Sequence, residues 1–188
     1  MASCSWIALG LSVFSLAGCT AKANRQFYGT VPDFELTDQS NQLFLSAKAL
    51  LGKIWIADFI FTNCPGPCPR MSSQMREVAT ALHDVKDLRM VSFTVDPARD
   101  TPEALGKYAA HYDAQPGVWF FLTGPQPDLH YLAKSVFKLG DVNGDLEHST
   151  RFVLIDQKSR IRGYYLTSDA DAIQFLIADA KQVSKEQF

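Results

Sequence analysis

The sequence predicts an α/β domain with a mixed central β-sheet flanked by helices. Three observations lead to this fold class. Short apolar runs rich in β-branched and aromatic residues alternate with longer amphipathic stretches. One run, residues 54–61, is nearly continuous in apolar residues, as in strands buried on both faces. The last two runs, 152–156 and 161–166, are separated only by a turn and therefore form a closing hairpin.

The composition is that of an ordinary folded domain. The 188 residues are enough for one hydrophobic core, and 47% of them are apolar and 20% charged. The formal net charge of −2 favours no polyanion as partner, so we expect no binding of nucleic acid.

The first 18 residues have the pattern of a bacterial lipoprotein signal peptide. The segment contains no Asp, Glu, Lys or Arg, and its apolar run, residues 6–17, is shorter than the roughly 20 residues that span a bilayer. It ends in Leu16-Ala17-Gly18-Cys19, which resembles the lipobox, where a peptidase cuts before the cysteine and the cysteine carries lipid. A signal peptide that is cut and lost, or an uncleaved anchor, is the alternative. We expect residues 19–30 to be the lipid attachment and a polar tether, and residues 31–188 to form the domain.

The elements of the domain follow from apolar patterning and from turn and cap residues. Two short apolar runs around a polar turn, 34–36 and 43–45, indicate an N-terminal hairpin. Thr101 is an expected N-cap, with Pro102 at the first helical position. After the buried strand, the order is helix 69–83, strand 88–95, the helix that Thr101 caps, strand 118–122, helix 128–139, the closing hairpin and helix 168–183. This order resembles an elaborated thioredoxin fold.

Two cysteines lie between the buried strand and its helix, in Cys64-Pro65-Gly66-Pro67-Cys68-Pro69. Proline lacks an N–H and suits a loop or the first helical turn, so Pro69 marks the start of the helix and Cys68 lies near its N-cap. Both sulfurs then lie near free backbone N–H groups, an environment that favours thiolate over thiol.

The cysteine pair has three possible chemical roles. With the leader removed and Cys19 lipidated, Cys64 and Cys68 are the cysteines left in the folded part. Such a pair in an oxidising compartment is a disulfide, a redox pair or a metal site. The three intervening residues permit a disulfide but leave more room for an ion than a Cys-x-x-Cys pair does. Thiolates select soft ions, above all Cu(I), and a structural disulfide remains the alternative.

One of the four histidines is a candidate third ligand. His83, His111 and His130 lie on or at the ends of predicted helices, where we expect them to face solvent. His148 ends a polar loop just before a core strand, and in a thioredoxin fold that loop end lies beside the cysteine-bearing turn. Two thiolates and one imidazole suit copper in both oxidation states. A surface histidine is the alternative.

Two methionines follow the second cysteine at helical spacing. Met71 and Met75 are four residues apart, which places them on one face of the predicted helix. Methionine sulfur can bind Cu(I), but the same spacing fits a buried face, and we predict that both side chains belong to the core.

Three motifs occur in one order along the domain. They are Phe61-Thr62-x-Cys64-Pro65-x-x-Cys68-Pro69, then Val95-Asp96-Pro97-x-Arg99-Asp100-Thr101-Pro102, then His148-Ser149 ahead of Leu154-Ile155-Asp156. Together they resemble the Sco/SenC/PrrC family over about residues 31–180. This sequence departs from the family pattern in two places. It has Glu147 where the family often has Asp, and its expected anchor is a lipid where the family usually has a transmembrane helix. We interpret Asp96 to Pro102 as a strand-end turn and helix cap, not as a ligand set.

The resemblance implies a function. Members of this family are membrane-tethered, thioredoxin-like copper proteins that help assemble the binuclear copper centre of cytochrome c oxidase. Their copper ligands correspond to Cys64, Cys68 and His148, and the two cysteines can also form a disulfide. We therefore expect one Cu(I) or Cu(II) per monomer, a copper-receiving oxidase subunit or another cuproprotein as partner, and an upstream copper donor or thiol reductant.

Two other function classes stay open. On the first hypothesis, the protein is a metallochaperone and not an enzyme. On the second, it is a thiol–disulfide oxidoreductase with Cys64 and Cys68 as its catalytic pair. A redox or copper sensor is the third. Thioredoxin-type oxidoreductases carry a cis-proline before the strand equivalent to 152–156, and Ser149-Thr150-Arg151-Phe152 has none, which favours the chaperone. We expect a lipid-anchored protein of the bacterial cell envelope that faces the periplasm or extracytoplasmic space.

Overall fold

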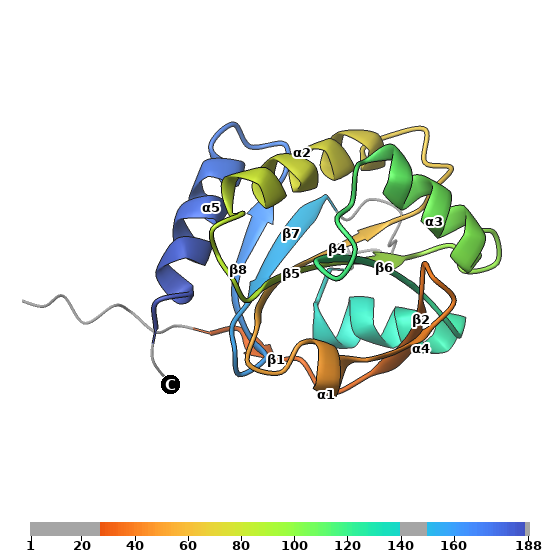
Figure 1. Cartoon of the computed structure of the whole chain (residues 1–188), viewed down its shortest axis with the longest axis horizontal. Coiled ribbons are helices and arrows are strands. Elements are labelled where there is room, and N and C mark those ends of the chain that lie inside the picture. Colours follow the sequence, from red (N-terminus) through yellow and green to blue (C-terminus); the bar gives the residue numbers. More distant parts are fainter. Residues whose placement is uncertain (1–26, 140–149, 187–188) are drawn as a thin grey trace, which may run out of the picture.

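A mixed β-sheet organises the chain in the computed structural model (Figure 1). The structure describes residues 27–139 and 150–186, and in these segments no helix has the length and apolar character needed to cross a membrane. The sheet order is β1-β8-β7-β4-β5-β6-β2-β3, with β4, β5 and β6 parallel and the other pairs antiparallel. The strands are β1 (Gly29–Thr30), β2 (Glu35–Asp38), β3 (Leu43–Leu45), β4 (Ile54–Ile60), β5 (Leu88–Thr94), β6 (Trp119–Thr123), β7 (Arg151–Ile155) and β8 (Arg160–Leu166).

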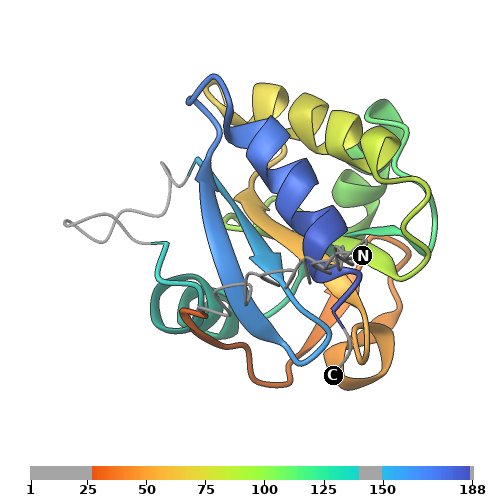
Figure 2. The ribbon, with the colours of Figure 1, turned by 90° about the vertical axis from the view of Figure 1, so that its left-hand side faces the viewer.

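Helices cover both faces of this sheet (Figures 1 and 2). Helices α2 (Cys68–Ala81), α3 (Pro102–His111) and α5 (Ala172–Val183) lie on one face. The opposite face carries α1 (Ser46–Ala49), α4 (Gln126–Tyr131) and the π-helical turn η1 (Leu132–Val136) that continues α4. The prediction of a mixed sheet flanked by helices is confirmed, and β2 and β3 form the predicted N-terminal hairpin at one end of the sheet.

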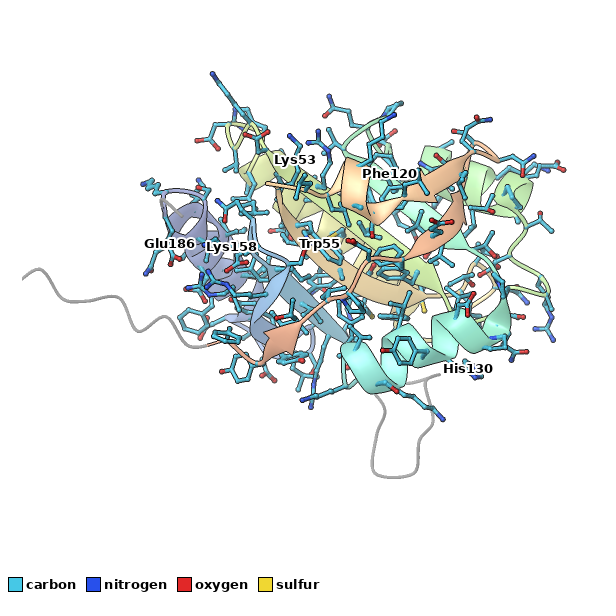
Figure 3. All side chains as sticks on the ribbon, turned by 90° about the horizontal axis from the view of Figure 1, so that it is seen from below. Lys53, Trp55, Phe120, His130, Lys158 and Glu186 are labelled. Atoms are coloured by element: carbon cyan, nitrogen blue, oxygen red, sulfur yellow. The ribbon has the colours of Figure 1, made fainter. Side chains whose placement is uncertain are left out.

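Strand β4 divides the interior into two apolar cores. All seven of its residues are buried, as the nearly continuous apolar run predicted. Ile54, Ile56 and Ile60 point to the core under α2, α3 and α5, whereas Trp55 and Phe59 point to the core above α1 and α4. Figure 3 looks onto the α4 side, where Trp55 and Phe120 are labelled. The strand that carries the cysteine loop is therefore held from both sides.

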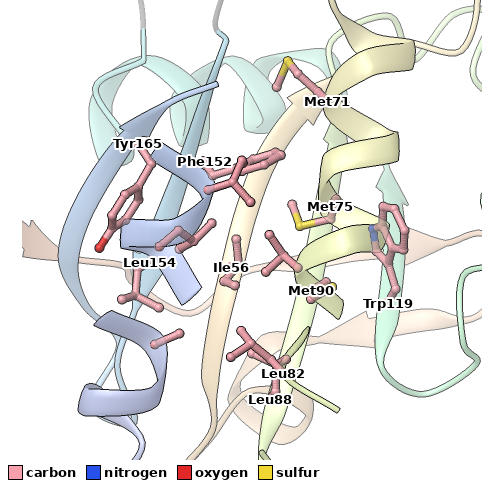
Figure 4. Close-up of a cluster of buried hydrophobic side chains, with 14 of the residues drawn as sticks. Ile56, Met71, Met75, Leu82, Leu88, Met90, Trp119, Phe152, Leu154 and Tyr165 are labelled. Atoms are coloured by element: carbon pink, nitrogen blue, oxygen red, sulfur yellow. The ribbon is translucent and has the colours of Figure 1, made fainter. Parts of the chain in front are cut away.

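Met71 and Met75 belong to the first of these cores. Both side chains have an exposed fraction of 0% and belong to the core cluster that also contains Ile56 and Met90. In Figure 4, Met75 lies near Ile56 and Met90, and Met71 lies farther along α2. The predicted core role of the two methionines is confirmed.

Local signals set several boundaries correctly. Helix α2 begins at Cys68, with proline in its first turn, and α3 begins after Thr101, whose hydroxyl accepts the Ala104 N–H at 3.3 Å. The turn before α3 is closed by the Asp100 N–H, which donates to the Asp96 carbonyl at 2.9 Å. The interpretation of this motif as a strand-end turn and helix cap is confirmed.

Four local details differ from the prediction. Gly29 and Thr30, assigned to the tether, form β1, because they pair with Ile161 and Arg160 of β8. Helix α1 was not predicted, since four residues are too few to show a helical period. The helix predicted over 128–139 changes to π geometry, with the Phe137 N–H donating to the Leu132 carbonyl at 2.8 Å. The last helix begins at Ala172 and not at 168.

The parallel pairing of β4 and β5 positions the cysteine loop. Ile60 and Thr94 are register partners at the carboxyl ends of these strands, and the Val95 N–H donates to the Ile60 carbonyl at 2.9 Å. The loop that follows β4 and the turn that follows β5 therefore leave the sheet at the same edge.

Candidate functional site

The cysteine loop joins β4 to α2. After β4, the Cys64 N–H donates to the Phe61 carbonyl at 3.3 Å and closes a tight turn. The chain then reaches α2, where the Met71 N–H makes the first helical hydrogen bond, to the Pro67 carbonyl at 3.0 Å. The prolines stand where no helical N–H is needed, so they stiffen the loop without cost to α2.

The two predicted site cysteines come together, but in different environments. Cys64 is partly exposed, whereas Cys68 has an exposed fraction of 3% and packs in the core beside Met71. Both are free thiols, and the Cys64 sulfur lies within hydrogen-bonding reach of Cys68. An incoming reagent or ion therefore meets Cys64 first.

Cys68 differs from the expectation for a sulfur at a helix N-terminus. Burial raises the pKa of the Cys68 thiol to about 12, and the adjacent Cys64 thiol and the charge of Asp58 act in the same direction. A hydrogen bond from the Phe61 backbone lowers this pKa and offsets only part of the rise. The prediction that both cysteines favour thiolate is wrong for Cys68, because desolvation outweighs the helix terminus.

A buried carboxyl group lies in the strand before the loop. Asp58, in β4, has an exposed fraction of 0%, and neither of its carboxylate oxygens has a hydrogen-bond partner in the part of the chain that the structure describes. Burial raises its pKa to about 7, although the nearby Ser92 hydroxyl on β5, which accepts the Trp119 indole N–H at 2.9 Å, acts to lower it. Sequence reasoning missed Asp58, although a single charged residue inside an apolar strand was the available signal.

The predicted third ligand and the predicted lipid site lie outside the described residues. These are His148 and Cys19. Within residues 27–139 and 150–186, no group of three His, Cys, Asp or Glu side chains could hold a metal ion. Of the other histidines, His83 and His111 are exposed, as predicted, and His130 on α4 is half-buried.

The arrangement supports two chemistries. Two thiols in mutual reach can lose two electrons and two protons to form a disulfide, or lose protons and bind a soft ion. Either reaction removes the proton that burial holds on Cys68, and the rigid loop limits the reorganisation that the pair needs.

The amino-acid sequence resembles one known family. A family model described as SCO1/SenC matches residues 22–184. A SCO1 protein homolog of Bacillus subtilis (strain 168) is 33% identical over 146 residues, which cover 74% of this chain and 76% of that protein.

Solved structures are similar over most of the chain. A SCO1/SenC family lipoprotein from Bacillus anthracis str. Ames has a TM-score of 0.74 and 32% identity, covering 84% of this chain and 96% of that chain. BsSco, described with a disulfide switch and as a member of the Sco family of cytochrome c oxidase assembly proteins, has a TM-score of 0.72 and 30% identity, covering 85% and 95%. Yeast Sco1 with copper bound has a TM-score of 0.68 and 26% identity, covering 86% and 96%. These similarities confirm the predicted thioredoxin-like fold.

Proposed function

Because the chain belongs to the SCO1/SenC family, we propose that it binds one copper ion through Cys64, Cys68 and His148 and delivers it to, or prepares, the binuclear copper site of a cytochrome c oxidase. The observation that carries the proposal is the pair of free thiols in mutual reach at the end of β4. Two relatives support it, since yeast Sco1 has been solved with copper bound and BsSco is described as belonging to cytochrome c oxidase assembly proteins.

The strand pairing supports His148 as the third ligand. Strand β7 is antiparallel to β4, with Ala57 opposite Val153, and begins two residues earlier at Arg151. The start of β7 is therefore at the sheet edge where the cysteine loop begins. His148 is three residues before Arg151 in the sequence, a separation of at most about 10 Å along the chain.

A thiol–disulfide oxidoreductase is the second candidate function. It is favoured by the hydrogen-bonding reach between Cys64 and Cys68, and by the disulfide switch in the description of BsSco. On this hypothesis Cys64, the more exposed thiol, attacks the partner's disulfide and Cys68 resolves the mixed disulfide.

Replacement of His148 separates these two functions. His148→Ala is expected to lower the copper content of the oxidase at least several-fold in cells grown at low copper, because two thiolates alone hold Cu(II) poorly. The purified variant should retain most of any disulfide-reducing activity, which depends on the thiols. His83→Ala, at an exposed histidine outside the loop, is the control. An oxidase of normal copper content in the His148→Ala strain would reject copper transfer and leave the oxidoreductase.

We also propose that Cys19 carries the lipid that holds the protein to the bacterial cell envelope, with the domain on the extracytoplasmic side. The lipobox-like Leu16-Ala17-Gly18-Cys19 supports this anchor, and the similar protein from Bacillus anthracis is described as a lipoprotein. The several acyl chains of a bacterial lipoprotein hold it firmly, and Cys19→Ser should leave an unlipidated precursor. Mass spectrometry of the mature N-terminus measures whether Cys19 carries lipid. A wild-type N-terminus without lipid would contradict the proposal.

A further inference from the structure

A second buried carboxylate, Asp100, binds the cysteine loop. Its exposed fraction is 1%, and it lies just before α3. The Thr62 hydroxyl donates to its Oδ1 at 2.5 Å and the Thr62 backbone N–H donates to its Oδ2 at 3.1 Å. The Thr94 hydroxyl, at the end of β5, donates to Oδ2 at 2.5 Å. Asp100 thus accepts hydrogen bonds from the cysteine loop and from the end of β5, and it joins the two.

Thr62 directly follows the residue whose backbone contacts both cysteines. The preceding residue, Phe61, hydrogen-bonds through its backbone to the Cys68 sulfur, and its carbonyl accepts the Cys64 N–H at 3.3 Å. Asp100 holds the next peptide N–H and the adjacent hydroxyl. The backbone that contacts both cysteines is thus fixed at its neighbouring residue.

Asp100 is itself fixed by hydrogen bonds to the turn between β5 and α3. The Asp100 N–H donates to the Asp96 carbonyl at 2.9 Å, and the Thr94 hydroxyl accepts the Asp96 N–H at 2.9 Å. Thr101 then caps α3. Asp100 is therefore held by β5 and α3 while it holds the loop.

We propose that Asp100 is a positioning residue for the cysteine pair, which acts through Thr62 to keep Cys64 against Cys68 and so sets the effective concentration of one thiol at the other. This inference rests on the proposed function in one respect, because the proposed function states which reaction Cys64 and Cys68 take part in. A fixed pair needs less ordering when it forms a disulfide or binds an ion, so both products become more stable. Sequence spacing gave no sign of this role, because Thr62 and Asp100 are 38 residues apart.

The structure offers a matched pair of variants as the test. Thr62→Val and Thr94→Val each remove one hydroxyl that donates to Asp100 at 2.5 Å, but only Thr62 lies in the cysteine loop. The measurement is the equilibrium of the full chain, in detergent, with glutathione. Cys64–SH and Cys68–SH transfer two electrons and two protons to glutathione disulfide, which leaves the Cys64–Cys68 disulfide and two molecules of reduced glutathione.

We expect Thr62→Val to lower this equilibrium constant about tenfold, in keeping with the loss of one buried side-chain hydrogen bond. Thr94→Val should lower it less than twofold, even where the melting temperatures of the two variants fall equally. Thr62→Ser keeps the hydroxyl and should restore the wild-type constant. Asp100→Asn should also lower the constant, because its side chain offers one acceptor oxygen where Asp100 uses two.

The inference is overturned if the equilibrium constant of Thr62→Val equals that of wild type. It is also overturned if Thr94→Val lowers the constant as much as Thr62→Val, which would mean a general structural role. The equilibrium needs no copper, so wild-type protein that binds none would reject the proposed copper function and leave this test intact.

Discussion

Replacing Cys64 or Cys68 by serine is expected to lower the affinity of the reduced protein for Cu(I) by on the order of a thousandfold. A serine hydroxyl is a hard, neutral ligand, so each variant leaves one thiolate where the soft ion needs two. The measurement is competition with a chromophoric Cu(I) chelator under reducing conditions, with copper stoichiometry determined at the same time.

A methionine in the adjacent core supplies the control. Met71 has an exposed fraction of 0% and packs with the residues under α2. Met71→Leu conserves volume and should leave Cu(I) affinity within about twofold of wild type. Tight binding retained in Cys64→Ser would exclude the proposed site, and weakened binding in Met71→Leu would make that sulfur a ligand.

The same experiment has an expected pH dependence. Burial raises the pKa of Cys68 to about 12, so at neutral pH copper must displace a proton from this thiol. The apparent Cu(I) affinity should therefore rise with pH across the neutral range, by up to about tenfold per pH unit for each proton released. An affinity that stays constant from pH 6 to 8 would mean that Cys68 is already a thiolate.

Replacing Asp58 by asparagine is expected to remove a large pH-dependent destabilisation. The folded protein keeps the Asp58 carboxyl protonated up to about pH 7, whereas the unfolded chain ionises it near its usual pKa of about 3.9. As pH rises between these values, ionisation favours the unfolded state, so the wild-type free energy of unfolding falls. The loss is complete above about pH 7 and amounts to roughly 4 kcal/mol.

The asparagine side chain of Asp58→Asn does not ionise, so this variant does not lose free energy of unfolding in this way as pH rises. Relative to wild type, the variant should gain roughly 4 kcal/mol in free energy of unfolding between about pH 4 and pH 8. Urea unfolding of the reduced protein at several pH values measures the difference, which is independent of the other titrating groups to first order. Parallel pH profiles for the two proteins would show that Asp58 is ionised in the folded state.

Asp156 provides a control of opposite sign. It is equally buried, but Arg160 and Arg162 approach its Oδ2 at 2.7 and 3.2 Å. Burial acts to raise its pKa, but the hydrogen bonds from Arg160 and Lys158 outweigh it and lower the pKa below the usual value. Asp156→Asn should therefore destabilise most at neutral pH, and its effect should diminish as pH falls through the acid range.

The contrast between these two aspartates shows what tertiary structure decides. In the sequence, Asp58 is one charged residue in an apolar run and Asp156 follows another. Their partners differ because Asp156 lies at a hairpin turn that brings Arg160 back to it, whereas Asp58 points into the core under α2. Whether a buried carboxyl is paired depends on neighbours that only the packed sheet supplies.

The sequence by itself determined the class of fold and the chemistry of the loop. Apolar period and run length identified most of the strands and helices, and Pro69 and Thr101 marked helix starts, because these signals act within a few residues. The sequence also predicted Cys64 and Cys68 as the site. Copper binding by this pair stays a prediction, and so does the role of His148 as the third ligand.

Tertiary structure alone decided the short and distant features. The two residues of β1 form a strand only because β8 lies beside them, and Thr62 meets Asp100 only because β4 and β5 end at the same edge. The protonated state of Cys68 likewise depends on the core that surrounds it, not on its place at the start of α2. Local sequence sets the conformations that a segment favours, whereas desolvation and hydrogen bonding depend on which segments the folded chain brings together.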